Sequence, residues 1–183
     1  MPVTEWLREH DRDAAQWPWR WAIGHHTSVA RGLCAQWLAA SALPTAALPL
    51  PLLGDPLRTL AELAQRMAQS PTFCAQPDWR GTQPDTGPWS RPNCPLQGPA
   101  SNAAMRLVPR LVDLLRLAAP EGAQWLAHGA LPLGPREGVA WTEMSRGLLV
   151  HWVGLDGTGE AARTEAYRVL APTEWNFHPR GVL

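Results

Sequence analysis

The last third of the sequence holds the pattern that most restricts the fold. Residues 146–172, RGLLVHWVGLDGTGEAARTEAYRVLAP, contain two β-rich runs separated by a segment rich in Gly and Asp. Such runs on either side of turn-forming residues are typical of a β-hairpin. The pattern predicts strands near 147–155 and 163–171 that pair antiparallel. Pro172 should end the second strand, since proline has no N–H to donate to a ladder.

Helical spacing is the main pattern before this hairpin. Ser28 is a candidate N-cap for a helix that runs to about Ala42. Asp55 and Pro56 match the preferred chemistry of a helix start, and a further helix has Pro109 near its beginning. The apolar residues that recur at helical spacing are Ala30, Leu33, Cys34, Trp37 and Leu38, then Leu57, Leu60, Ala64 and Met67, and then Val108, Leu111, Val112 and Leu115.

Segments rich in proline and glycine separate these helical stretches. We expect residues 44–51 to form an apolar connector, residues 71–100 a long loop that is either ordered or mobile, and residues 120–138 an irregular segment. The predicted fold is therefore α+β, with several helices packed with a C-terminal antiparallel β-hairpin. A length of 183 residues suits one domain. Within a single domain over 1–183 we expect a Trp-rich segment at 1–27, a mainly helical part at 28–118, and the hairpin with its closing motif at 139–183.

Composition limits the classes of partner. The 16 basic residues balance the 16 acidic ones, and the chain has no lysine. Nucleic acid is not an expected partner, because its binding requires a basic surface. Tryptophan is unusually frequent, with 11 copies. Trp17, Trp19 and Trp21 surround Arg20 in WPWRWAIG, which is compatible with a partner-binding patch, a cation–π cluster or part of the core.

The cysteines indicate a reducing compartment. Cys34, Cys74 and Cys94 are scattered, odd in number and without a C-x-x-C pair, which argues against a disulfide framework. The first residues are charged and lack the apolar region of a secretory leader, and no apolar run is long enough to span a membrane. We therefore expect a cytoplasmic protein without a membrane span. Arg91 could activate Cys94 as a thiolate, although an inert, semi-buried cysteine is the simpler interpretation.

The remaining reactive groups do not by themselves identify an enzyme. His25 and His26 are adjacent, so their side chains diverge, and two solvated histidines explain them better than a metal site does. Glu143 and Asp156 could serve as acid and base, but nothing in the sequence brings them together. The sequence contains no phosphate-binding loop, dinucleotide-binding motif or Ser-His-Asp order.

The C-terminal third resembles part of the large subunits of nickel–iron hydrogenases. In those proteins a P-R-G-x-L-x-H strand leads through a hairpin to a Y-x-x-x-x-P-T-x-W-N-x-x-P-R segment. The matching positions here are Arg146, Gly147, Leu149, His151, Tyr167, Pro172, Thr173, Trp175, Asn176, Pro179 and Arg180. Upstream, DTGPWSR at 85–91 looks like the E-T-G-x-x-x-R element of the same proteins, with Asp in place of Glu. The resemblance covers about a third of the chain and implies a fold similar to part of a large subunit.

Two departures from that family determine the function that the resemblance implies. Large subunits hold their metals with four cysteines in two C-x-x-C motifs, whereas this chain contains neither motif and is far shorter. A working nickel–iron centre is therefore not expected, because thiolates are the ligands that such a site requires. Sequence of this kind without the cysteine motifs is similar to the hydrogenase expression/formation proteins of the HupK/HoxV type.

That similarity implies a non-catalytic accessory protein in hydrogenase maturation. It would act as a scaffold or chaperone for the Fe(CN)2(CO) unit or for the immature large subunit, with maturation proteins or that subunit as partners. Two alternatives stay open: a degenerate fragment of a redox subunit, and a structural interaction module that docks through Trp17, Trp19 and Trp21 and has no metal role.

The resemblance also implies roles for the closing motif. The Pro-Arg pair lies beside the metal site in the catalytic subunits, so Pro179 and Arg180 are expected to face a cyanide-bearing iron unit. A guanidinium suits this role, because it is a permanent cation with fixed donors and cyanide nitrogen is an anionic acceptor. A solvated or carboxylate-paired Arg180 is the equal alternative. Thr173 and Asn176 are expected to bond their own backbone in a turn, and to contact the iron unit only secondarily.

Other positions have structural expectations or remain candidates for metal binding. Trp175 should pack as a core plug beneath the closing turn, and His151 should be a structural histidine on its strand. If iron is retained, its ligands must include Cys34, Cys74 or Cys94, or come from a partner protein.

Overall fold

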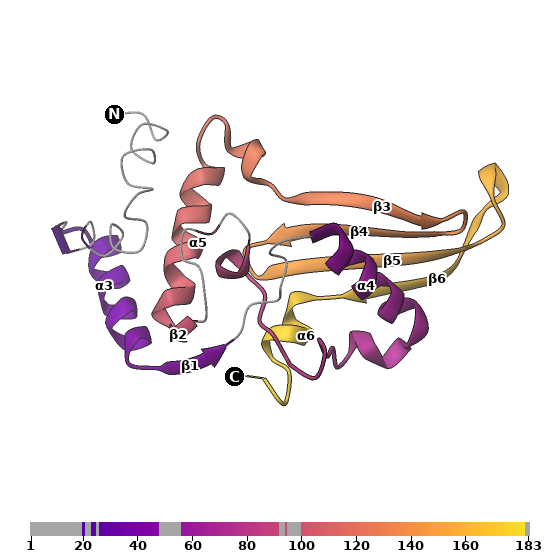
Figure 1. Ribbon diagram of the computed structural model, residues 1–183. Helices are drawn as coiled ribbons and strands as arrows, with labels where there is room; N and C mark the ends of the chain where they lie inside the picture. Colours follow the sequence, from indigo (N-terminus) through magenta and orange to yellow (C-terminus); the bar gives the residue numbers. More distant parts are fainter. Residues whose placement is uncertain are drawn as a thin grey trace.

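A four-stranded antiparallel sheet is the largest element of the computed structural model (Figure 1), which describes residues 20, 23–24, 26–47, 56–91, 94 and 100–181. Each strand pairs with the next one in sequence, in the order β3-β4-β5-β6. The bounds are β3 His128–Gly134, β4 Glu137–Met144, β5 Gly147–Asp156 and β6 Arg163–Leu170. The protein is thus α+β, as the sequence predicts.

The C-terminal hairpin forms as predicted, but it is only half of the sheet. β5 and β6 pair antiparallel, with Val150 opposite Leu170 and Asp156 opposite Arg163. The prediction of an irregular segment at 120–138 is wrong, because this segment contains β3 and the start of β4. Pro132 does not prevent a strand here, since β3 is at the sheet edge and proline is tolerated there.

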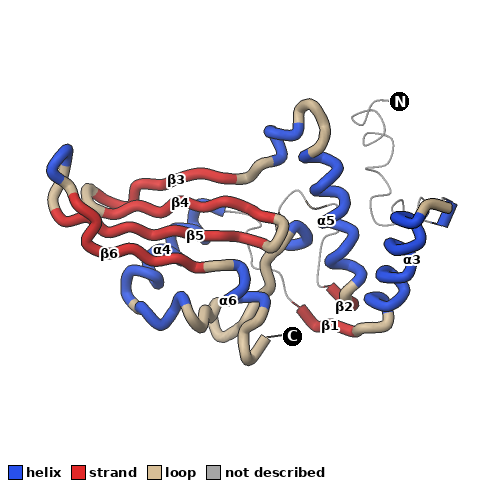
Figure 2. Tube along the Cα trace, turned by 180° about the vertical axis from the view of Figure 1, so that it is seen from behind, coloured by secondary structure: helices blue, strands red, loops and turns tan. Residues whose placement is uncertain are grey.

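Helix α4, Pro56–Gln69, covers one face of the sheet. Its buried apolar residues pack with alternate residues of β5, namely Leu148, Val150 and Trp152. In Figure 2, seen from behind, the sheet lies in front of α4. This layer contains the main core, whose helical residues are Leu60, Leu63, Ala64 and Met67.

The predicted buried stripe of α4 was wrong at one position. Leu57 is 51% exposed, whereas Leu63 is fully buried. Position 63 shares a helical face with positions 60, 64 and 67, because 3.6 residues make one turn. Leu57 lies in the first turn, at the end of that stripe. Asp55, its predicted N-cap, lies outside the described residues.

Helices α3 and α5 form a second, smaller cluster beside the end of the sheet (Figure 1). α3 spans Ser28–Ser41 and α5 spans Ala104–Leu117. The N-cap of α3 is Thr27 and not Ser28, since Thr27 Oγ1 accepts the Ala30 N–H at 3.1 Å. The cluster joins Val108 and Val112 to Trp37, Leu111 and Leu115, as the helical spacing of α5 predicts.

The segments between these layers are more ordered than proline content suggests. Two short strands, β1 Pro44–Ala47 and β2 Ala100–Asn102, pair with each other. They replace the first half of the predicted connector, and residues 48–55 are not described. Between 71 and 91 the chain is ordered, with 3₁₀ turns η2 Pro71–Cys74 and η3 Pro88–Ser90. The other short elements are η4 Gly122–Trp125, η5 Gly159–Ala161 and α6 Pro172–Asn176. Among the described residues, no helix is long and apolar enough to cross a membrane.

Candidate functional site

Three motifs that lie far apart in sequence meet at Thr86 and Asn176. The Asn176 side chain accepts the Thr86 N–H at 2.9 Å and donates to the Thr86 carbonyl at 3.0 Å. It also donates to the Arg146 carbonyl at 2.9 Å. Thr86 Oγ1 in turn accepts the Leu148 N–H at 2.9 Å. We call this meeting point of residues 85–91, 146–148 and 172–180 the motif junction.

Gly147 allows the close approach on which the motif junction depends. Its φ is +132°, in a region that residues with a Cβ rarely adopt. A Cβ at this position would lie 2.6 Å from Thr86 Cγ2 and 2.8 Å from the Thr86 carbonyl oxygen. Any side chain at 147 would therefore push β5 away from Thr86.

A buried ion-pair network is centred on Arg91, the last residue of the 85–91 segment. Arg91 donates from Nη1 to Asp113 of α5 at 2.5 Å and from Nε to Glu143 of β4 at 3.2 Å. Its Nη2 donates to the Met144 carbonyl at 2.8 Å. One guanidinium therefore connects residues 85–91 to both α5 and the sheet, and all three charged side chains are buried or nearly so.

A second part of the network involves Asp85, which forms an ion pair with Arg106 of α5. Arg110, one turn further along, donates from Nε to the Ser145 carbonyl at 3.3 Å. Arg106, Arg110 and Asp113 follow each other at spacings of four and three, so they lie on one face of α5. That spacing is a signal in the sequence that could have revealed the charged face, and the sequence reasoning missed it.

Burial changes the acid–base properties of two carboxyl groups in this network. Burial raises the pKa of Glu143 to about 7, and the Arg91 cation only partly opposes this shift. Burial also raises the pKa of Asp85 from its usual value, against the opposing effect of Arg106. Glu143 Oε1 is buried without a hydrogen-bond partner, which is consistent with a carboxyl that favours its neutral form.

The closing motif has a buried side and an exposed side. Trp175 is 1% exposed and meets the ring of Phe73 edge-on, which confirms its predicted place as a core plug. Thr173 and Pro179 are exposed. The prediction for Asn176 was wrong, because its side chain bonds Thr86 and Arg146 rather than its own turn. It can do so because α6 follows β6 directly and its last residue lies against both other motifs.

Arg180 points outward at the surface. Its side chain is 69% exposed, and its guanidinium lies 4.0 Å from the Asp78 carboxylate. Its backbone N–H donates to Nδ1 of the buried His178 at 3.0 Å. The backbone at Arg180 is therefore held while the guanidinium stays accessible.

Among the described residues, the other candidates do not form a common site. His151 hydrogen-bonds and stacks with Tyr167 of β6, which confirms a structural histidine. Glu143 and Asp156 lie near opposite ends of the sheet, since Glu143 is opposite Leu148 and Asp156 is at the far end of β5. Trp17, Trp19, Trp21 and His25 lie outside the described residues.

The cysteines are separated in the fold. Cys34 is on α3, Cys74 is in η2, and Cys94 follows η3. Burial raises the pKa of the Cys74 thiol, so this sulfur favours its neutral form. Arg91, the cation considered for Cys94, forms ion pairs with Glu143 and Asp113. In the described part of the chain, no group of three His, Cys, Asp or Glu side chains could hold a metal ion.

The curated proteins that follow have similar sequences and are all described as hydrogenase expression/formation proteins. The hydrogenase expression/formation protein HoxV of Cupriavidus necator is 37% identical over 188 residues, which cover 97% of this chain and 49% of that protein. The hydrogenase expression/formation protein HupK of Bradyrhizobium diazoefficiens is 34% identical over 133 residues, 66% of this chain and 34% of that protein. HupV of Azotobacter chroococcum, with the same description, is 32% identical over 74% of this chain and 37% of that protein.

The chain therefore spans half or less of the length of these curated relatives. No protein-family profile and no solved structure matches it.

Proposed function

The chain is a homologue of the hydrogenase expression/formation proteins of the HoxV and HupK type, and on this premise we propose that it is a non-catalytic scaffold or chaperone in hydrogenase maturation. Its partners would be maturation proteins or the immature large subunit, and its cargo the Fe(CN)2(CO) unit. The names of the relatives support the maturation role, and the scaffold role is our extension of it.

The motif junction is the observation that supports a scaffold role best. Residues 85–91, 146–148 and 172–180 carry the sequence resemblance to hydrogenase large subunits, and the side chain of Asn176 connects all three. Buried charges and hydrogen bonds hold this region in one arrangement. A rigid surface of this kind can present side chains to a partner without performing chemistry itself.

Arg180 is the residue that we assign to contact with the cargo or the partner. Its guanidinium is exposed and lies 4.0 Å from the Asp78 carboxylate, at the limit of ion-pair distance. It therefore keeps donors for an anionic acceptor such as the nitrogen of an iron-bound cyanide. Pro179 restricts the backbone before it, and Thr173 lies exposed on the same short segment.

The donors in the described part of the chain do not supply an evident ligand set for iron. Cys34, Cys74 and Cys94 are on separate elements, and no group of three ligand-type side chains occurs among the described residues. In our proposal the partner protein therefore supplies the thiolates. This chain contributes hydrogen bonds to the outer atoms of the cargo.

The test is anaerobic purification of the tagged chain from a hydrogenase-producing strain. We expect maturation proteins or the immature large subunit to co-purify, identified by mass spectrometry. Infrared spectra of the same sample should show CN and CO stretches if the iron unit is carried. The absence of both the partner and the infrared bands would exclude this function.

Replacing Arg180 with Ala tests the assigned contact. We expect at least about a tenfold loss of partner or iron retention, as for one charged hydrogen bond, with an unchanged melting temperature because the side chain is exposed. Arg136→Ala is the matched control, since Arg136 is also exposed but lies in the turn between β3 and β4. Equal retention by the two variants would remove Arg180 from the site.

A further inference from the structure

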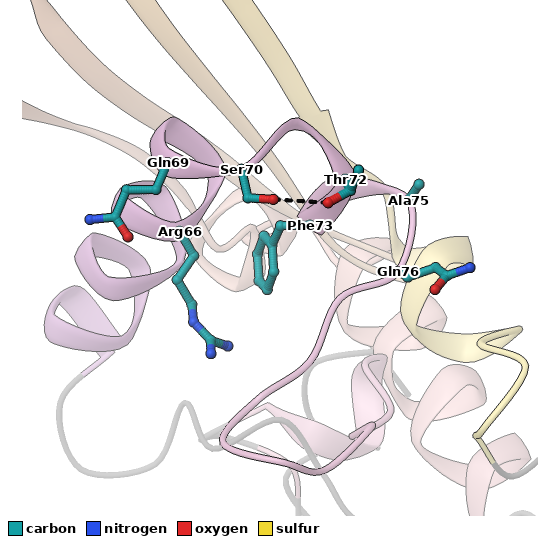
Figure 3. Close-up of a pocket in the computed structure, with 7 residues that line it drawn as sticks. All are labelled: Arg66, Gln69, Ser70, Thr72, Phe73, Ala75 and Gln76. Carbon is teal, nitrogen blue, oxygen red and sulfur yellow. Dashed lines mark hydrogen bonds between the residues drawn. The ribbon is translucent and has the colours of Figure 1, made fainter.

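An open cavity lies at the C-terminal end of α4, apart from the motif junction. Its volume is about 550 Å³, and its walls come from the last turn of α4, from η2 and from the two residues after η2. Figure 3 shows Gln69 and Arg66 at one side and Gln76 at the other, with Ser70, Phe73 and Thr72 between them. This volume is within the range typical of small-molecule sites, about 300–1,000 Å³.

Arg66 is the charged residue of the cavity wall. Its guanidinium donates to the Asp78 carbonyl and lies 5.2 Å from the centre of the Phe73 ring. These two contacts fix its position, but neither neutralises its charge. Glu62, one turn earlier on α4, forms its ion pair with Arg80 at 2.9 Å. Within the described part of the chain, no carboxylate lies within ion-pair distance of Arg66.

The other polar groups of the wall can donate hydrogen bonds. Gln69 and Gln76 each carry an amide NH₂ with two donors. Ser70 Oγ and Thr72 Oγ1 are hydrogen-bonded to each other at 2.9 Å. Only one of the two hydroxyl protons is used in that bond, so the other remains for a ligand. The wall thus combines one fixed cation with several donors and contains no acidic residue.

One local effect opposes anion binding here. The cavity lies at the C-terminus of α4, where the helix dipole is negative. Arg66 is in the last turn of this helix, and the Arg168 guanidinium from β6 donates to the Met67 carbonyl. Two cations at this end of the helix therefore offset the dipole.

We propose that this cavity binds a small organic oxyanion, a molecule with a phosphate or carboxylate group. The oxyanion would accept hydrogen bonds from Arg66, from the Gln69 and Gln76 amides and from the free hydroxyl proton of the Ser70–Thr72 pair. The organic part would occupy the rest of the cavity, which is larger than a phosphate ion requires. This site is independent of the maturation role proposed above.

The test is isothermal titration calorimetry of the full chain with glycerol 3-phosphate and, separately, with succinate at constant ionic strength. These two probes distinguish phosphate from carboxylate recognition. We expect at least one to bind at millimolar concentration or below. Arg66→Gln should weaken that binding at least about tenfold, as expected for hydrogen bonds from a charged donor. Arg136→Gln, which removes an exposed charge elsewhere, should leave it unchanged.

A second variant keeps the proposal testable if Arg66→Gln does not fold. Gln76 is exposed, and Gln76→Ala should fold normally and weaken binding about threefold, as for one neutral hydrogen bond. If neither probe binds the wild-type chain, or if the folded variants bind as tightly as the Arg136→Gln control, the proposal is wrong. None of these results depends on hydrogenase partners, so they leave the proposed maturation role to its own test.

Discussion

At the residue scale, the Asn176 side chain makes three long-range hydrogen bonds in the motif junction. Its amide offers both a donor group and an acceptor, and the structure uses both. The partners lie 90 and 30 residues earlier in the chain. Matching one N–H and two carbonyl groups at once requires a side chain with both an acceptor and two donor protons, as an amide has.

Asn176→Ala should therefore lower the free energy of unfolding by about 2–4 kcal/mol, since it leaves the N–H and carbonyl of the buried Thr86 without their partners. Urea unfolding followed by Trp fluorescence measures the change. Thr173→Ala is the control on the same short helix, and it should change stability by less than about 0.5 kcal/mol because Thr173 is exposed. A similar loss in both variants would contradict the bridging role of Asn176.

Glu143 should make the free energy of unfolding depend on pH. Its pKa is raised to about 7 in the folded protein from an ordinary value of 4.5, so the folded state binds the proton more tightly than the unfolded state does. The stabilisation from this proton is fully present below pH 4.5. It is lost as the pH rises through about 7.

We expect the free energy of unfolding to fall by up to about 3 kcal/mol between pH 4.5 and pH 8 through this group. Urea titrations across that range measure it. Glu143→Gln cannot ionise, so the variant should show a flatter dependence over the same pH range. An unchanged slope in the variant would mean that another group titrates.

At the element scale, α4 is amphipathic and its buried stripe is set by the sheet. Leu60, Leu63, Ala64 and Met67 pack against the sheet core, whereas Leu57 in the first turn stays half exposed. The hydrophobic effect rewards only the area that is removed from water. Two leucines of one helix should therefore differ strongly in their contribution to stability.

Leu63→Ala should cost about 2–5 kcal/mol, because it leaves a cavity between α4 and the sheet. Leu57→Ala should cost less than about 1 kcal/mol, because its side chain is largely hydrated already. Thermal unfolding of the two variants compares the same chemical change at two positions of one helix. Equal losses would indicate that α4 does not pack as described.

At the scale of the whole molecule, two apolar clusters of unequal size are connected by buried ion pairs. The larger cluster lies between α4 and the sheet, and the smaller one lies between α3 and α5. Arg91 and its partners on α5 and β4 connect the two. α3 contributes Trp37 to the smaller cluster, but Ala30 is its one buried residue.

Amide hydrogen exchange should be slower in β5 than in α3. The amides of β5, which pairs with strands on both sides, should exchange through global unfolding. Those of α3 should exchange through local opening, at a free energy lower by roughly 2 kcal/mol or more. Mass spectrometry of peptides after exchange distinguishes the two segments. Equal protection of α3 and β5 would contradict a weakly attached α3.

The elements were predictable where a local pattern is strong. The β5–β6 hairpin, the amphipathic stripe of α5 and the burial of Trp175 all follow from periodicity or from the residue types themselves. β3 was missed because Gly and Pro weaken its strand pattern, and a sheet edge tolerates them. Leu57 was misplaced because helical spacing alone does not say where the partner sheet ends.

The sequence by itself determined the α+β class, the closing hairpin and the three motifs of the junction, since each depends on residues close together in the chain. Only the tertiary structure decided that Asn176 bridges those motifs and that Arg91 pairs with Glu143 and Asp113. It also decided that Arg180 points outward. The physical reason is that a hydrogen bond or ion pair depends on the distance between two groups in space. For partners 22 to 90 residues apart, that distance is set by the packing of the whole chain.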